Sequence, residues 1–248
     1  MNLKNTDKIF KKLSSSTGQI ALLLDPEKCS NLFVLKEILK KAEFSQLDYI
    51  FIGGSTVTKN EFDKTIDFIK ANSNLPLVIF PGASHQISEK ADAILYLSLL
   101  SGRNPDFLIG HHIQTALEVY DMDIEVLPTA YILIDGGTKS SVAYVSQTIP
   151  IPRDQISIIK NTATAGVLQG KKIIYFDAGS GADFSVNSKT IEEVQFLNTP
   201  IIVGGGIRSI EQIEKLNKSG VNIIVIGNHI EDNIDFLLDI HSYNLTKN

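Results

Sequence analysis

The sequence predicts a single (β/α)₈ barrel, and three observations lead to that fold class. Eight short apolar runs alternate with amphipathic stretches, which is typical of a parallel sheet covered by helices. Several of these runs stop at glycine, as strands do where they meet a turn. The chain has 248 residues, close to the length that one closed barrel requires. We therefore expect one domain that spans residues 1–248, because no linker or change in composition divides it.

The apolar runs give the strands in order. We predict strands over residues 19–24, 48–52, 77–80, 94–97, 125–134, 172–176, 201–203 and 222–226. Helical spacing predicts a short helix ahead of the barrel over 9–13, and then helices over 32–44, 61–71, 106–120, 157–168, 190–197, 210–218 and 230–240. The stretch 83–91 is short and polar for a covering helix, so we expect a loose segment after the third strand.

Composition excludes several classes of protein. The formal net charge is −5 and the pI about 5.5, which argues against non-specific nucleic-acid binding. Cys29 is the only cysteine, so neither an internal disulfide nor a thiolate metal site is expected. No apolar run approaches the roughly 18 residues of a membrane span. Residues 1–13 lack the apolar core of a signal peptide. These observations indicate a cytoplasmic enzyme.

The strongest functional signal is the run Thr199 to Ser209. A strand stops at the glycines Gly204–Gly206, and a helix follows with Ser209 as its expected N-cap. Glycine allows close approach of the backbone, and exposed N–H groups favour an anion. Two more glycine-bearing strand ends, 177–181 and 227–228, are neighbours of this one in a closed barrel. Together they predict a site for a phosphorylated small molecule; the alternative is that the glycines form tight turns only.

The first strands end in residues that suit a cation. Asp25 follows the first strand and Ser55 the second, and a carboxylate with a hydroxyl is a common weak Mg²⁺ site. The alternative is that both side chains cap the helices that follow. Lys28 and Arg103 could neutralise a diphosphate, or could be ordinary solvated side chains. His111 and His112 have no ligand partner at helical spacing, so we predict a structural role for both.

Five motifs in a fixed order carry a family resemblance. They are Asp25-Pro26-Glu27-Lys28, Phe51-Ile52-Gly53-Gly54-Ser55, Tyr175-Phe176-Asp177-Ala178-Gly179-Ser180-Gly181-Ala182, Val203-Gly204-Gly205-Gly206-Ile207-Arg208-Ser209 and Ile226-Gly227-Asn228. In this respect the chain resembles the geranylgeranylglyceryl phosphate synthase family, including its bacterial heptaprenylglyceryl phosphate relatives. The resemblance covers nearly the whole chain, from the first strand to the eighth.

The resemblance implies an activity. It implies a modified TIM barrel, with a helix replaced after the third strand, that catalyses a Mg²⁺-dependent prenyl transfer. A hydroxyl of sn-glycerol 1-phosphate would attack C1 of a long prenyl diphosphate, with geranylgeranyl diphosphate the expected donor. The products would be an ether-lipid precursor and pyrophosphate. It also implies a homo-oligomer, either a dimer or a hexamer. Because substrate and product are lipids, peripheral membrane contact is a further expectation.

The resemblance also assigns residues. Asp25 and Ser55 would bind Mg²⁺, while Lys28 and Arg103 would face the diphosphate, with Lys28 and Asp177 as the catalytic residues. The residues expected to hold glycerol 1-phosphate are Tyr175, Phe176, Asp177, Ala178, Gly179, Ser180, Gly181, Gly205, Gly206, Gly227 and Asn228. One departure stands out, since the family usually has Glu where this chain has Asp177. Aspartate reaches about 1.5 Å less far, so either the backbone compensates or the carboxylate acts through water.

Two other functions remain open at this stage. A sugar-phosphate isomerase or epimerase would need a paired acid and base, for which Asp25 and Asp177 are candidates. A catalytically silent barrel that binds glycerol phosphate or prenyl diphosphate is the other alternative, favoured only by Asp177 in place of Glu. Isotope exchange without prenyl diphosphate would indicate the isomerase, and binding without turnover would indicate the silent barrel.

Overall fold

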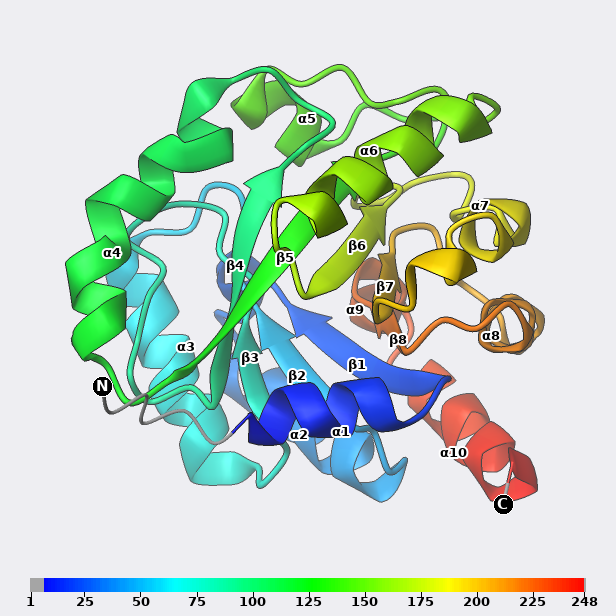
Figure 1. The fold of residues 1–248 in the computed structure, drawn as a ribbon. Helices are drawn as coiled ribbons and strands as arrows, with labels where there is room; N and C mark the ends of the chain where they lie inside the picture. The colour runs from blue at the N-terminus through cyan, green and yellow to red at the C-terminus, as the bar shows by residue number, and fades with distance from the viewer. Residues whose placement is uncertain (1–6, 248) are drawn as a thin grey trace.

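A computed structural model describes residues 7–247, which form a closed barrel of eight parallel strands in sequence order (Figure 1). The predicted fold class is therefore confirmed. The strands are β1 (Gln19–Leu24), β2 (Tyr49–Ile52), β3 (Leu77–Ile79), β4 (Ala93–Leu99), β5 (Glu125–Leu133), β6 (Ile173–Asp177), β7 (Ile201–Gly204) and β8 (Ile223–Ile226). The barrel closes where β1 pairs with β8, with Ala21 opposite Val225.

Helices surround the barrel. The α-helices are α1 (Lys8–Ser15), α2 (Leu32–Phe44), α3 (Lys59–Asn72), α4 (His111–Asp121), α5 (Ser141–Ser146), α6 (Ile156–Leu168), α7 (Ser188–Glu192), α8 (Ile210–Lys218), α9 (Asn228–Asp232) and α10 (Phe236–Lys247). Three short turns of other types complete the set: η1 (Pro26–Lys28), η2 (Asp106–Gly110, a π-turn that leads into α4) and η3 (Gln195–Leu197). No helix among the described residues is long and apolar enough to cross a membrane.

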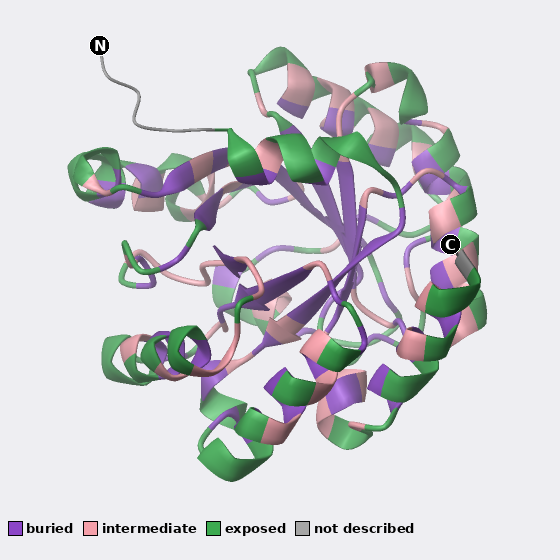
Figure 2. Ribbon diagram, turned by 90° about the horizontal axis from the view of Figure 1, so that it is seen from below, coloured by how far each residue is buried: buried purple, intermediate pink, exposed green. Residues whose placement is uncertain are grey.

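Each strand is buried on both faces because its side chains alternate between two apolar layers. In β2, Tyr49 and Phe51 point into the barrel, whereas Ile50 and Ile52 pack under the helices. Figure 2 shows the result: a buried barrel inside a ring of helices whose outer faces are exposed. Full burial of one such side chain contributes about 1.5–3 kcal/mol, so this double layer is the main source of stability.

The short helix α1 packs against the amino-terminal end of the barrel. Its Ile9 and Leu13 belong to the interior apolar cluster. The Glu125 carboxylate at the start of β5 accepts hydrogen bonds from the N–H groups of Ile9 and Phe10, both at 2.7 Å. These bonds satisfy helix amides that would otherwise lack partners. The cavity described below is therefore at the opposite, carboxyl end of the strands.

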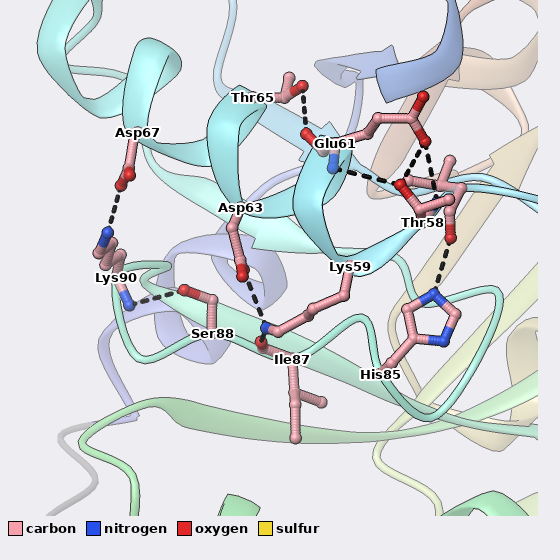
Figure 3. Close-up of polar contacts among 11 residues, drawn as sticks. Thr58, Lys59, Glu61, Asp63, Thr65, Asp67, His85, Ile87, Ser88 and Lys90 are labelled. Carbon is pink, nitrogen blue, oxygen red and sulfur yellow. Dashed lines mark hydrogen bonds and ion pairs between the residues drawn. The ribbon is translucent and has the colours of Figure 1, made fainter.

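The segment between β3 and β4 contains no helix, as predicted for residues 83–91. Side-chain contacts to α3 and the residues just before it hold it instead (Figure 3). Lys59 donates to the carbonyl oxygen of Ile87 at 2.7 Å, and Nε2 of His85 lies 2.7 Å from the carbonyl oxygen of Val57. Lys90 forms an ion pair with Asp67. The space that a covering helix would fill is thus bordered by a fixed loop.

Two predicted helices differ in the structure, and one helix was not predicted. The helix predicted over 190–197 is two short pieces, α7 and η3. The first piece begins earlier than predicted, because the Asn187 side chain caps it by accepting from Lys189 N. The helix predicted over 230–240 is broken between α9 and α10, where Asn233 is extended and its side chain accepts from Asp235 N. The prediction missed α5, whose N-cap is Ser140.

Candidate active site at the carboxyl ends of the strands

A cavity of about 380 Å³ lies at the carboxyl ends of the strands, where loops from both halves of the chain meet. This is the end of a (β/α)₈ barrel at which active sites are found. Most of the predicted site residues line it: Asp25, Lys28, Ser55, Tyr175, Asp177, Ser180, Gly181, Gly205, Gly206, Gly227 and Asn228. The fold therefore brings together side chains that are up to about 200 positions apart in the sequence.

The loops after β6, β7 and β8 form one continuous wall of backbone. The φ angles of Gly181, Gly205 and Gly206 are +72°, +85° and +68°, values that favour glycine. A Cβ on Gly205 would lie 2.7 Å from the N and O atoms of Gly179, so the two loops touch. The Ser180 hydroxyl donates to Asn228 Oδ1 at 2.9 Å and joins the third loop.

This wall presents amides to the cavity. The N–H groups of Gly181 and Gly206 donate to no other residue within the described chain. Successive amides in such loops form a concave anion site. Ser209 caps α8 as predicted, in a capping box with Gln212. The arrangement can hold a phosphate group by its oxygen atoms.

Asp177 lies at the end of β6 with both carboxylate oxygens occupied. Oδ2 accepts from the Tyr131 hydroxyl at 2.5 Å, and Oδ1 accepts from Gly179 N–H at 2.7 Å. Burial raises the pKa of the Asp177 carboxyl, and the two hydrogen bonds oppose that rise. The Phe80 ring stacks on Tyr175 and meets Tyr131 edge-on, which fixes this part of the cavity floor. The carboxylate is thus held in one orientation.

Asp25 and Ser55 are adjacent across the loops after β1 and β2. A Cβ on Gly54 would lie 2.5 Å from Asp25 Oδ1, so only glycine lets the two loops approach this closely. Burial raises the pKa of Asp25, while the Glu27 N–H and the Lys28 charge oppose the rise. The Ser55 hydroxyl forms no hydrogen bond to another described residue. Two hard oxygen donors of this kind fit Mg²⁺, with its other positions left to water and a diphosphate.

Lys28 lies at the rim of the cavity between the first and last loops. Its Nζ is 2.6 Å from Glu231 Oε2, in an ion pair that joins η1 to α9 across the seam of the barrel. The Lys28 side chain is 45% exposed, so an anion that enters the cavity can reach it. The cation is therefore positioned beside Asp25 before any ligand binds.

The opposite wall is apolar and extends between β4 and α4. Its apolar lining comes from the loop after β3, from β4, from η2 and from α5: Ile87, Ile94, Leu97, Leu99, Phe107, Val142 and Val145. This arm occupies the side where the barrel lacks a covering helix. His111 and His112, for which the sequence predicted a structural role, also line it, and burial lowers the pKa of His112. No group of three or more His, Cys, Asp or Glu side chains that could hold a metal ion occurs there or elsewhere in residues 7–247.

Four predicted site residues do not line the cavity. The Arg103 guanidinium turns back onto its own loop and donates to the carbonyl oxygens of Leu100 and Gly102, so it does not line the cavity. Phe176 packs under the outer helices, because it follows the inward-facing Tyr175. Ala178 and Gly179 support the wall from behind.

Sequence reasoning missed three residues of the site. Tyr131 lies in the middle of an apolar strand, and nothing in its neighbours distinguishes it from a core tyrosine. Glu231 lies on a helix of five residues where the pattern suggested a longer helix. Arg208 lines the cavity and donates to the Gly181 carbonyl oxygen at 3.3 Å. Its position two residues after the glycine run was the one available signal.

Comparison with known proteins agrees with this geometry. The sequence matches the PcrB family over residues 16–242. It is 46% identical over 232 residues to the geranylgeranylglyceryl phosphate synthase of Zunongwangia profunda, covering 92% of this chain and 97% of that protein. It is 39% identical to the enzyme of the same name from Pyrococcus furiosus, covering 85% and 83%.

A solved structure is similar throughout. The (S)-3-O-geranylgeranylglyceryl phosphate synthase of Thermoplasma acidophilum, in complex with sn-glycerol-1-phosphate, has a TM-score of 0.88 and 33% identity and covers 96% of each chain. The tryptophan synthase α-subunit of Pyrococcus furiosus, with a TM-score of 0.56 and 13% identity, shares the fold alone. From the length of these matches, the chain belongs to the PcrB family, together with the geranylgeranylglyceryl phosphate synthases.

Proposed function

We propose that the protein is a prenyltransferase that joins sn-glycerol 1-phosphate to a long prenyl diphosphate through an ether bond. The observation that carries the proposal is a cavity with an amide-lined phosphate wall on one side and an apolar arm on the other. A relative with 33% identity was solved in complex with sn-glycerol-1-phosphate, which supports the assignment of the first substrate. The name of the relatives supports a geranylgeranyl donor.

In the proposed reaction, the loops after β6, β7 and β8 hold the phosphate group of glycerol 1-phosphate. The N–H groups of Gly181 and Gly206 and the loop at Gly227–Asn228 bind its oxygens, and the one of its two hydroxyls that reacts points toward Asp177, which lines the same cavity. Fixing this geometry replaces a bimolecular encounter with a positioned reaction. Burial of the tail in the apolar arm contributes about 0.8 kcal/mol for each CH₂ group.

The bond changes follow from these positions. The glycerol oxygen forms a bond to C1 of the prenyl group, the bond from C1 to the diphosphate oxygen breaks, and the hydroxyl proton passes to the Asp177 carboxylate. Tyr131 keeps that carboxylate in one orientation. Lys28 offsets the charge of the leaving diphosphate. Asp25 and Ser55 would hold Mg²⁺, which supplies further charge neutralisation there.

The proposal extends to how the protein exists in solution. We infer a homo-oligomer, a dimer or a hexamer, and a location in the cytoplasm, both of which rest on the family. Equilibrium sedimentation of the purified chain would test the first, since a single species of 27.3 kDa would contradict it.

The direct test is product formation. Purified protein is incubated with Mg²⁺, radiolabelled sn-glycerol 1-phosphate and prenyl diphosphates of increasing length, and label is counted in the organic phase. We expect transfer that is Mg²⁺-dependent and reduced at least 100-fold in Asp25→Asn. Binding of glycerol 1-phosphate without transfer at any length would indicate the silent barrel. Turnover without prenyl diphosphate would indicate the isomerase.

A further inference from the structure

An exposed apolar patch borders the cavity on the side of α5. Tyr144 on α5 and Ile149 just after it are each 87% exposed, and Phe184 in the loop after β6 is 49% exposed. Figure 1 shows α5 at the top of the drawing, and these residues all lie in segments that follow the carboxyl ends of β5 and β6. Large apolar side chains exposed to this degree in one region indicate a surface that contacts something other than water.

The arginines of the chain lie at the same end of the barrel, in segments that follow the carboxyl ends of strands. The sequence contains three arginines, and Arg103, Arg153 and Arg208 follow β4, β5 and β7. Every ion pair found in residues 7–247 uses a lysine, so none of these guanidinium groups has a carboxylate partner there. Unpaired guanidinium groups bind phosphate oxygens well.

Two of the arginines belong to the apolar patch. Arg103 and Ile149 line the same shallow surface pocket. The Arg153 guanidinium lies 4.2 Å from the centre of the Phe184 ring, in a cation–π contact. We call Tyr144, Ile149, Phe184, Arg103 and Arg153 the mouth rim. It combines apolar tips with cations, the pattern by which peripheral proteins sit at a lipid surface.

Helix α5 faces the cavity on one side and carries part of the mouth rim on the other. Ser141, Val142 and Val145 of α5 line the cavity, while Tyr144 of the same helix points to solvent. We propose that the mouth rim docks the protein on a phospholipid bilayer, with the apolar tips inserted and the arginines on headgroup phosphates. The inference rests on the proposed function, because a tail that enters the cavity from a bilayer needs the mouth to face that bilayer.

The experiment is sedimentation with vesicles of phosphatidylcholine and phosphatidylglycerol that contain no prenyl diphosphate. We expect the protein to sediment with them, and Tyr144→Ser/Ile149→Ser to lower the bound fraction at least tenfold. Arg103→Gln/Arg153→Gln should remove the part of binding that falls with salt. The matched control is Leu168→Ser/Leu245→Ser, which removes equally apolar residues, 83% and 58% exposed, from the opposite end of the barrel.

Three outcomes would overturn the proposal: no sedimentation of the native protein, equal binding by the rim variant, or loss of binding by the control. A lower oligomer mass for the rim variant, measured by light scattering, would instead assign the patch to contact between copies. Transfer to a short, water-soluble prenyl diphosphate should be the same in all variants. If that transfer fails in the native protein, the proposed function fails, and the vesicle result still stands by itself.

Discussion

The two sides of the cavity are built in different ways. Around β6, β7 and β8 the wall is backbone, and its shape depends on glycines at positive φ that touch one another. Around β4 and α4 the wall is made of apolar side chains, on the side where the barrel lacks a covering helix. The backbone wall tolerates little substitution at Gly205 and Gly206, because a Cβ at either position would lie within 3.0 Å of backbone atoms. A side-chain wall can be reshaped, so we expect the two sides to respond differently to mutation.

The largest effect should come from Gly205→Ala. The new Cβ would lie 2.7 Å from backbone atoms of Gly179 at a φ of +85°, which combines a clash with strain. We expect a loss of about 2–5 kcal/mol in the free energy of unfolding and no measurable binding of glycerol 1-phosphate by calorimetry.

The matched control is Gly170→Ala. Its φ is +84°, but a Cβ there would meet nothing within 4 Å, so only the conformational strain applies, about 1–2 kcal/mol. If both variants lose the same stability and both bind the ligand, the contact between the glycine loops contributes nothing to the phosphate wall.

The next largest effect concerns the Asp177 carboxylate, which lies between the two walls of the cavity. In Tyr131→Phe, Asp177 loses the hydrogen bond at 2.5 Å that favours its ionised form. Removing that bond raises the carboxyl pKa further above 3.8, so the ionised fraction begins to fall at a higher pH. We expect kcat to fall about ten- to 100-fold, as for a hydrogen bond to a charged group. The acid limb of the kcat profile should move to higher pH.

Tyr49→Phe is the control for that prediction. Tyr49 is also a buried tyrosine, and its hydroxyl donates to Gln19 Oε1 at 2.9 Å near the amino-terminal end of the barrel. The Tyr49→Phe variant should have a lower free energy of unfolding, and the acid limb of its kcat profile should stay at the same pH. An unchanged acid limb in Tyr131→Phe would remove Asp177 from the proton transfer.

The same contrast explains what sequence reasoning could reach. The loops with positive φ require glycine, and these glycines are visible in the sequence. The phosphate loops and the strands before them could therefore be predicted. Ile94 and Phe107 of the apolar arm carry no such signal, because in the sequence they cannot be distinguished from core residues. Arg103 was assigned by its charge, yet its direction depends on carbonyl groups of its own loop. The role of Tyr131 depends on its hydrogen bond to Asp177, which is 46 positions away in the sequence, so the sequence around Tyr131 does not reveal it.

A third prediction tests the side-chain wall. Ile87→Trp adds volume to the apolar arm, because Ile87 lines the cavity. We expect the KM for the longest accepted prenyl diphosphate to rise about tenfold, since several CH₂ groups lose their burial. Binding of glycerol 1-phosphate and transfer to a short donor should not change. Ile87→Val, which adds no bulk, is the control, and an equal KM increase in both variants would contradict an arm at this position.

The smallest effect should come from the anchor of the loop that replaces the helix. Lys59 donates to the Ile87 carbonyl oxygen and pairs with Asp63 at 2.9 Å, with its side chain 48% exposed (Figure 3). Lys59→Met should cost about 1 kcal/mol in chemical denaturation, because the carbonyl loses a charged donor but water can partly replace it.

Lys218→Gln removes a comparable i,i+4 pair, to Glu214, that anchors no loop, and should cost only about 0.3–0.5 kcal/mol. Since the loop borders the arm, Lys59→Met should also raise the KM for the prenyl donor, by about twofold, while Lys218→Gln leaves it unchanged. A KM that stays constant in Lys59→Met would mean that the arm keeps its shape without this anchor, and that the apolar contacts of Ile87 hold the loop by themselves.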